Sequence, residues 1–204
     1  MSESPFVPLV FLSICLTKRL AVLPFILFTQ LTFFSSKSIH HICAGFFPTV
    51  RWIQMTPSTV CFGARDDSYG FFRTSKAGNI ITFKLTYRSG YVTCDARKSS
   101  FHSKWGCLWN RLIPNQMATL ITDKNRNLFL LKSDLLSDHW GCKFYSLPWA
   151  TTESSQLLFD NFSTPLTVET NQGFQIWYSK DLFKWGYGDN GHEKTCVAVY
   201  GLYV

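Results

Sequence analysis

The stretch that most clearly predicts the fold is Asn79-Ile-Ile-Thr-Phe-Lys-Leu-Thr-Tyr-Arg88. Its apolar residues Ile81, Phe83, Leu85 and Tyr87 alternate with Thr82, Lys84, Thr86 and Arg88. Successive side chains of a strand point to opposite faces of the sheet, so this alternation predicts a strand with one buried face and one basic, outward face. Gly78-Asn79 before the stretch and Ser89-Gly90 after it are typical of turns.

Shorter strands are predicted on both sides of this one. The expected strands are 59–64, 71–74, 117–122, 128–131, 156–159, 166–170, 174–179 and 196–204. The last is apolar on both faces, which is typical of a strand in the middle of a sheet. No segment after the N-terminal region has the apolar spacing of an amphipathic helix that could connect parallel strands. The sequence therefore predicts an all-β domain over residues 59–204, an antiparallel β-sandwich or jelly roll.

The composition agrees with a β-rich extracellular domain. Aromatic residues make up 17% of the 204 residues and charged residues only 16%, whereas an average chain carries about 25% charged residues. The formal charge of +7 is uneven, because residues 65–111 hold nine basic and three acidic residues and residues 112–204 hold seven and nine. The basic half suggests an anionic partner such as a sulfated glycan, a membrane surface or a mineral face. The alternative is that scattered lysines only keep the domain soluble.

Residues 1–38 are predicted to be an apolar targeting helix, either a signal peptide or a signal-anchor. Lys18 and Arg19 provide a charged start, and the apolar run Leu20–Phe34 is followed by several serines. As a helix this run rises about 22 Å, which is short of the roughly 30 Å of a bilayer core. Cleavage would release the body of the protein, whereas retention would leave it anchored with the domain outside. Residues 39–58 are expected to form a linker.

The cysteines indicate the same compartment. One lies in the targeting segment, and the other six are Cys43, Cys61, Cys94, Cys107, Cys142 and Cys196. An even number in an exported chain indicates disulfides. Cys94 and Cys107 flank a short polar loop, whose closure is worth roughly 3 kcal/mol on the chain-entropy model.

Position also suggests a second pair. Cys61 and Cys196 open the first and last predicted strands, and the termini of a compact domain usually lie close together. Cys43 and Cys142 are then paired by elimination only. A zinc site that uses His102 with Cys107 and His139 with Cys142 is the competing interpretation.

Five short motifs are spread along the predicted β domain. They are Cys61-Phe-Gly-Ala-Arg-Asp-Asp-x-Tyr-Gly-x-Phe72, Trp105-Gly-Cys107, Ile176-Trp-Tyr-x-x-Asp-Leu182, Asp189-Asn-Gly191 and Thr195-Cys-Val-Ala-Val-Tyr200. Together they resemble an uncharacterised family of extracellular domains from corals and sea anemones, over nearly all of residues 59–203. The family has no established activity, so the resemblance implies secretion and a β-sandwich but no reaction. The family pattern has an acidic residue where this chain has Lys180, which weakens the case for a bound cation here.

The segment 181–193 combines oxygen-bearing side chains and aromatic rings in a Gly-rich loop. The candidate ligand-binding residues are Trp185, Tyr187, Asp189, Asn190 and Glu193. An aromatic ring can stack on a sugar while carboxylates and amides bind its hydroxyls, so this composition predicts glycan binding.

The same loop suggests calcium, which prefers oxygen ligands. The candidate ligands are Asp181, Asp189 and Asn190, with Asp160, or Asp66 and Asp67, completing the shell. The alternative is an ordinary turn held by Asp and Asn side chains. Apart from Ca²⁺, no cofactor is expected.

No motif in the sequence predicts a reaction, so no catalytic residue is assigned and the protein is not expected to be an enzyme. The sequence has no GxSxG or HExxH motif. No nucleic-acid partner is expected, because the chain has no known binding module and is predicted to be outside the cell. A membrane is expected to be a partner only through the N-terminal segment. The sequon Asn161-Phe-Ser163 predicts a glycan at Asn161.

Two functional hypotheses follow from these features. The first is a secreted or membrane-anchored recognition module that binds glycans or extracellular matrix through the loop 185–193 and the basic strand face. The second is a structural matrix component with no discrete ligand site, whose basic face meets an anionic matrix or mineral.

Overall fold

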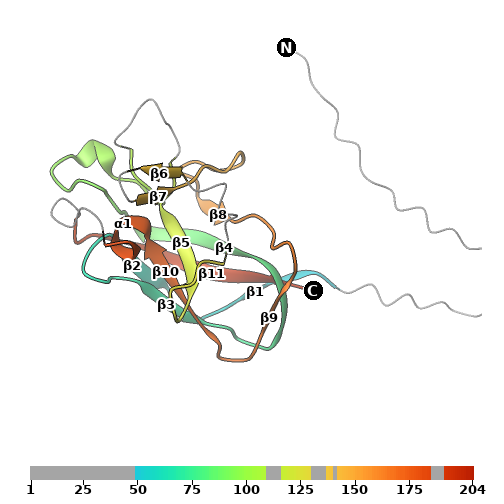
Figure 1. The fold of residues 1–204 in the computed structure, drawn as a ribbon. Helices are drawn as coiled ribbons and strands as arrows, with labels where there is room; N and C mark the ends of the chain where they lie inside the picture. Colours follow the sequence, from blue (N-terminus) through green and yellow to red (C-terminus); the bar gives the residue numbers. More distant parts are fainter. Residues whose placement is uncertain (1–48, 109–115, 130–136, 140–141, 185–190) are drawn as a thin grey trace, which may run out of the picture. The chain divides into compact units, whose positions relative to one another are not determined.

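The computed structural model describes residues 49–108, 116–129, 137–139, 142–184 and 191–204. Its largest sheet has six antiparallel strands (Figure 1). The two longest, β4 (Gly78–Gly90) and β11 (Lys194–Tyr203), pair with each other in the middle of the sheet. The other edge of β11 is shared by β1 (Arg51–Gln54) and β2 (Val60–Gly63), and that of β4 by β8 (Gln156–Leu158) and β9 (Leu166–Val168). β11 therefore lies inside the sheet, as its apolar sequence predicts.

A smaller sheet has three strands. β10 (Gly173–Tyr178) lies between β3 (Gly70–Arg73) and β5 (Thr119–Asp123) and is antiparallel to both. β6 (Ser137–His139) and β7 (Cys142–Phe144) form a separate hairpin. Helix in the described residues is limited to the 3₁₀ turn η1 (Ser99–Phe101) and the single turn α1 (Ser179–Leu182), which directly follows β10. The predicted all-β antiparallel class is confirmed.

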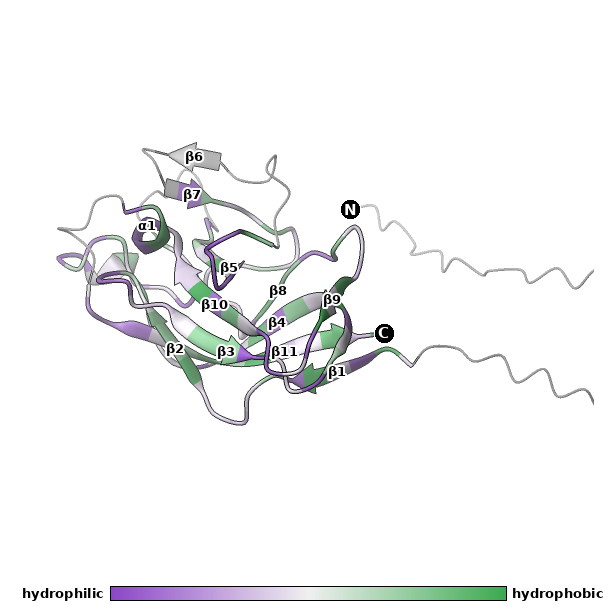
Figure 2. Cartoon of the chain, turned by 60° about the horizontal axis from the view of Figure 1, so that its bottom comes forward, coloured by the Kyte–Doolittle hydropathy of each residue, from purple (hydrophilic) through white to green (hydrophobic). Residues whose placement is uncertain are grey.

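The two main sheets pack through aromatic side chains. The ring centroid of Phe83 on β4 lies 5.7 Å from that of Phe72 on β3 and 5.4 Å from that of Phe174 on β10. All three side chains are buried, and aromatic pairs at such distances add about 0.5–1.5 kcal/mol to the gain from burial. Figure 2 shows hydrophobic residues on β3 and β10 as well as on strands of the larger sheet. The described part of the chain therefore forms a sandwich around one core.

β4 follows the predicted alternation only in part. Phe83 is buried, but Ile81 is only half-buried, whereas Ile80 and Thr82 are buried on either side of it. The register with β11 shifts at this point, so Ile81 has no partner on β11. Such a bulge inserts one residue into one strand and offsets the faces that follow. The prediction that Ile81 shares the buried face of Phe83 is therefore wrong. Thr82 is buried in its place, and its hydroxyl donates to main-chain carbonyls just after β8.

The sheet begins earlier than the sequence predicts. β1 lies inside the segment 39–58, which was expected to be a linker, and pairs with β11 from Arg51 opposite Tyr203 to Gln54 opposite Tyr200. The predicted targeting segment and Cys43 lie outside the described residues. No helix among the residues that are described is long and apolar enough to cross a bilayer.

Two disulfides join the cysteines that were paired from their positions. Cys61 and Cys196 are direct partners in the register of β2 and β11. Cys94 and Cys107, separated by 13 residues, close the loop that contains η1. Cys107 is therefore not available as a zinc ligand, and the side chain of Cys142 lies outside the described part of the chain. Such disulfides persist in oxidising compartments, which agrees with an extracellular domain.

Candidate functional site

The loop that the sequence singles out is described only at its ends. Trp185, Tyr187, Asp189 and Asn190 lie outside the described residues. Glu193 is exposed, and its main chain lies next to Gly63, whose amide donates to the carbonyl of Ser68 (2.7 Å). The loop therefore returns to the sheet beside the turn that links β2 to β3.

Asp181 lies at the start of this loop and is fully buried. Its position follows from α1, which carries the chain away from β10 immediately after the buried residue Tyr178. The two carboxylate oxygens accept hydrogen bonds from the main-chain amides of Asp67 (3.0 Å) and Ser68 (2.8 Å). Burial raises the pKa of Asp181, and these two amides oppose that effect. Asp181 thus holds a turn that is 114 residues away in the sequence.

The segment Arg65–Tyr69, here called the acidic turn, has an unusual backbone. Asp66 and Asp67 both have positive φ, 63° and 53°. Asp tolerates this left-handed conformation better than most residues, and turns with two such central residues join antiparallel strands. The carboxylate of Asp66 lies 3.5 Å from Arg65 and 3.4 Å from His192. The turn therefore exposes two carboxylates, and hydrogen bonds from its main-chain amides to Asp181 hold its backbone in place.

Two cationic side chains bind the carboxylate of Asp67. Oδ1 of Asp67 accepts hydrogen bonds from Lys184 and from Nη2 of Arg126, the latter at 3.2 Å. The pKa of Asp67 is lowered, chiefly because Lys184 donates a hydrogen bond to the ionised carboxylate. No hydrogen bond to the other oxygen, Oδ2, occurs within the described part of the chain. Asp67 is therefore an ionised acceptor with one oxygen engaged, and 49% of its side chain is exposed.

Aromatic rings complete this cluster. The ring centroid of Tyr69 lies 4.8 Å from that of the buried Trp177, and the guanidinium carbon of Arg126 lies 4.8 Å from the Trp177 ring. Tyr69 itself is 39% exposed. A ring that is exposed beside a carboxylate and a guanidinium has the composition of a sugar-binding surface.

The position of Arg126 is fixed by its own hairpin tip. Oδ1 of Asp123 accepts hydrogen bonds from the amides of Asn125 (2.7 Å) and Asn127 (2.9 Å). Arg126 lies between them with a φ of 67°. The tip that follows β5 is therefore internally bonded, and it directs Arg126 toward the acidic turn.

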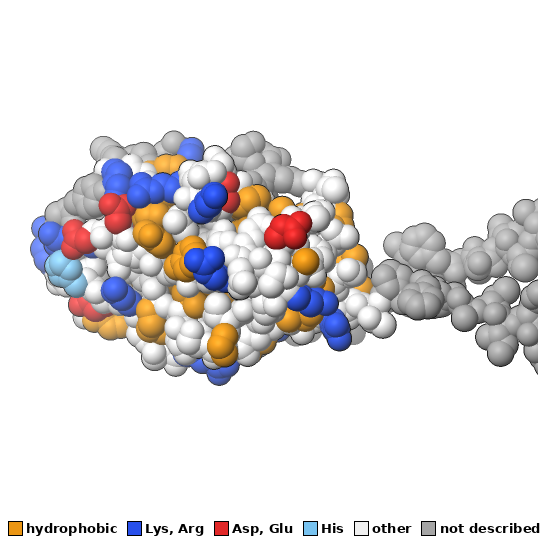
Figure 3. Space-filling model, turned by 90° about the horizontal axis from the view of Figure 1, so that it is seen from below, with side chains coloured by type: hydrophobic (Ala, Val, Ile, Leu, Met, Phe, Trp, Pro, Cys, Tyr) orange, Lys and Arg blue, Asp and Glu red, His pale blue; other side chains and the backbone are white. Residues whose placement is uncertain are grey.

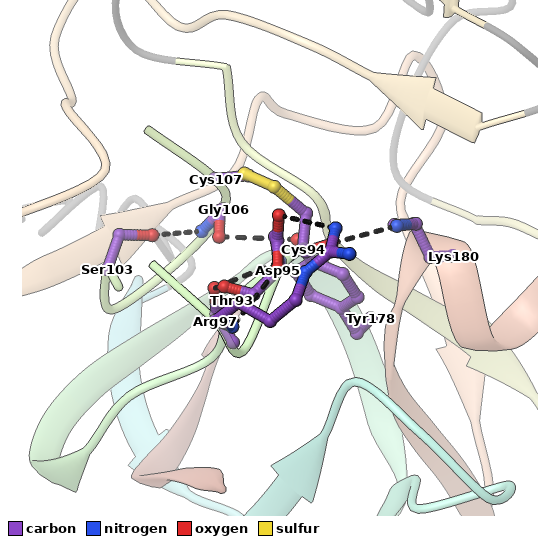
Figure 4. The surroundings of a disulfide bond; sticks show 9 residues. All are labelled: Thr93, Cys94, Asp95, Arg97, Ser103, Gly106, Cys107, Tyr178 and Lys180. Carbon is purple, nitrogen blue, oxygen red and sulfur yellow. Dashed lines mark hydrogen bonds and ion pairs between the residues drawn. A yellow bond between two sulfur atoms is a disulfide. The ribbon is translucent and has the colours of Figure 1, made fainter. Parts of the chain in front are cut away.

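α1 also contacts the disulfide loop. Nζ of the nearly buried Lys180 donates a hydrogen bond to the carbonyl of Cys94 (3.0 Å), as Figure 4 shows. In the same loop Asp95 pairs with Arg97 (2.8 Å), and this hydrogen bond lowers the pKa of Asp95 to about 2. Successive residues of α1, Lys180 and Asp181, thus tie the end of β10 to the disulfide loop and to the acidic turn.

The structure describes only some of the residues that the calcium hypothesis names. Among them, no group of three or more His, Cys, Asp or Glu side chains is placed to hold a metal ion. Both oxygens of Asp181 already accept main-chain hydrogen bonds, and Asp160 lies after β8, where its carbonyl accepts from Thr82. Asp189 and Asn190 lie outside the described residues, so a calcium site that includes them stays a prediction.

One cation of the predicted basic face, Lys84, contacts aromatic rings. Nζ of Lys84 lies 4.4 Å from the ring centroid of Trp52 and 5.0 Å from that of Tyr200. Arg73, Lys76 and Lys104 lie over other rings in the same way. Figure 3 shows one face on which exposed hydrophobic side chains are scattered, several of them beside Lys or Arg. On the described surface each of these four cations therefore lies over at least one aromatic ring.

Sequence reasoning missed three residues of the cluster as site residues: Tyr69, Arg126 and Lys184. Tyr69 occurs in the first motif, and Arg126 lies between the predicted strands 117–122 and 128–131. Neither pattern indicates that both residues contact the ring of Trp177. Asn161 is exposed in the β8–β9 connection, and its glycosylation stays a prediction.

Comparison with known proteins supports the fold. The architecture is that of disulfide-linked, antiparallel β-sandwich domains. Among solved structures, AJLec from the sea anemone Anthopleura japonica is similar, with a TM-score of 0.66 and 24% sequence identity over 76% of this chain and 98% of that chain. AJLec is a lectin, and its source agrees with the resemblance to sea-anemone domains. No protein-family model and no curated protein sequence matches this chain.

Proposed function

We propose that this protein is an extracellular glycan-binding module whose site is formed by the acidic turn, Arg126 and Lys184, and that residues of the loop 185–193 contribute to it. The shared fold with a sea-anemone lectin supports this class of function, and the two disulfides support an extracellular location. Secretion after cleavage of residues 1–38, or retention as an anchor, belongs to the same proposal.

The observation that carries the proposal is the exposed ring of Tyr69. It rests on the buried Trp177 at 4.8 Å and lies in the same turn as the ionised Asp67. A ring held by a buried partner loses little conformational freedom on binding, so more of its stacking energy with the apolar face of a sugar is available. Trp185 and Tyr187, which sequence composition favours, would add rings from the adjoining loop.

A glycan array probed with the full-length chain tests the proposal. We expect selective binding that falls at least about tenfold in Tyr69→Ala and is retained in Tyr69→Phe, because stacking needs the ring and not the hydroxyl. Phe71→Ala is the matched control, since Phe71 is also an exposed aromatic residue after β2 but lies under Arg73. Salt-sensitive adhesion without selectivity would instead favour the hypothesis of a structural matrix component.

A further inference from the structure

We propose that Asp67 and Arg126 together bind two adjacent hydroxyls of a neutral sugar, without a metal ion. This inference rests on the proposed function and assigns the chemical class of its ligand. Oδ1 of Asp67 is engaged by two cations, while Oδ2 has no hydrogen-bond donor in the described residues. The guanidinium of Arg126 carries five N–H donors, and among the described residues it donates only to Asp67. One acceptor and several donors therefore remain side by side.

Adjacent hydroxyls of a sugar match this arrangement. Each hydroxyl both donates and accepts a hydrogen bond, so one can donate to Oδ2 of Asp67 while its neighbour accepts from Arg126. Hydrogen bonds to ionised partners are about twice as strong as neutral ones. The lowered pKa of Asp67 keeps the carboxylate ionised, and therefore an acceptor, at neutral pH. The exposed ring of Tyr69 in the same turn is placed to contact the apolar face of the same sugar.

Both side chains are held in position before a ligand arrives. The main chain of Asp67 is fixed by the buried Asp181, and that of Arg126 lies in a tip fixed by Asp123. The guanidinium is held further by the Trp177 ring at 4.8 Å. Groups that are already ordered lose little entropy on binding, so weak hydroxyl contacts contribute more to affinity.

The same geometry disfavours an anionic sugar. The carboxylate of Asp67 lies within hydrogen-bond distance of Arg126, so a sulfate or carboxylate brought to the guanidinium would also approach Asp67. An ionised sulfate or carboxylate has no proton to donate to Oδ2 of Asp67, whereas a hydroxyl has one, so only a hydroxyl group can satisfy Oδ2 beside the guanidinium. The structure therefore favours neutral hydroxyls over acidic groups at this position.

The test uses the full-length chain on an array of neutral, sialylated and sulfated oligosaccharides, with and without EDTA. We expect neutral ligands that survive EDTA, and a loss of at least about tenfold in affinity in both Asp67→Asn and Arg126→Gln. Arg126→Lys, which keeps the charge but not the planar fork, should lose a similar factor. Lys124→Gln is the matched control in the same hairpin tip and should keep its affinity. Unchanged melting temperatures would show that the variants fold.

The possible results separate the two proposals. If deoxy analogues of the best ligand that lack either of two adjacent hydroxyls lose at least about tenfold, the inference is supported. Neutral ligands that are lost with EDTA but bind both variants normally would leave the glycan-binding function intact and overturn this inference. Binding confined to sulfated or sialylated sugars would do the same. No selective binding on any array would overturn the proposed function itself.

Discussion

Two of the clusters that place a cation over an aromatic ring differ in what lies beside the cation. On the outer face of the larger sheet, Lys84 lies between Trp52 and Tyr200, from β1 and β11. At the acidic turn, Arg126 lies over Trp177 and also pairs with Asp67. The first cluster covers apolar surface with a cation, whereas the second presents a donor and an acceptor together. Under the proposed function, the neighbouring carboxylate distinguishes a ring-bound cation of the binding site from one that only covers apolar surface.

The largest expected effect concerns the residue that supports only the second cluster. Asp181→Asn replaces a carboxylate oxygen with an amide nitrogen, so one of the amides of Asp67 and Ser68 loses its acceptor. A buried donor without a partner costs about 1–3 kcal/mol, and we expect a loss of about 2 kcal/mol in the free energy of unfolding. Urea denaturation measures this loss. Amide hydrogen exchange should accelerate at residues 67 and 68 while the amides of β4 and β11 keep their relative protection.

A matched control is available for this substitution. Asp160→Asn keeps an acceptor oxygen for the single amide of Asn161 that Asp160 binds, and it should change stability by less than about 0.5 kcal/mol. If Asp181→Asn left both stability and the exchange of residues 67 and 68 unchanged, the acidic turn would not depend on Asp181.

The sequence could predict the features that depend on local patterns but not those that depend on contacts between distant residues. The period-two pattern of residues 79–88 and the apolar segment 196–204 identify β4 and β11, because strand pairing and burial act on local patterns. β1 was missed because a short segment between Pro48 and Pro57 carries no such pattern, and it becomes a strand only where the edge of β11 is available. The sequence pointed to Asp181, and to Asp66 and Asp67 only as one way to complete a calcium shell. It did not predict that Asp181 holds the main chain of Asp67, since the two residues meet only after the sheets have packed.

A smaller effect is expected on the outer face. Trp52→Ala removes a ring that is 37% exposed and that contacts Lys84, and exposed cation–π contacts are worth about 0.5–1 kcal/mol. We expect a loss of about 1 kcal/mol by urea denaturation and no change in glycan binding. Val50→Ala, a more exposed position just before the same strand, should change stability by less than about 0.5 kcal/mol. A marked loss of glycan binding in Trp52→Ala would remove the functional difference between the two clusters.

The smallest expected effect is a difference between Asp67 of the acidic turn and the buried Asp181 in how their contributions to stability depend on pH. The pKa of Asp67 is lowered from 3.8, chiefly by the hydrogen bond from Lys184. Its contribution to stability is therefore fully present above pH 3.8 and is lost as the pH falls through the lower folded value. The pKa of Asp181 is raised from 3.8 by burial. The folded state then binds more protons, so the contribution of Asp181 decreases as the pH rises through its folded value.

Denaturation of three proteins across this range measures the two opposite slopes. The stability difference between the natural chain and Asp67→Asn should be constant above about pH 5 and shrink below 3.8. The difference between the natural chain and Asp181→Asn should be largest below pH 3.8 and shrink as the pH rises. Slopes of the same sign would mean that the two carboxylates share one environment. Opposite slopes would show that the turn has a buried carboxylate that supports it and an exposed, ionised one that faces the ligand.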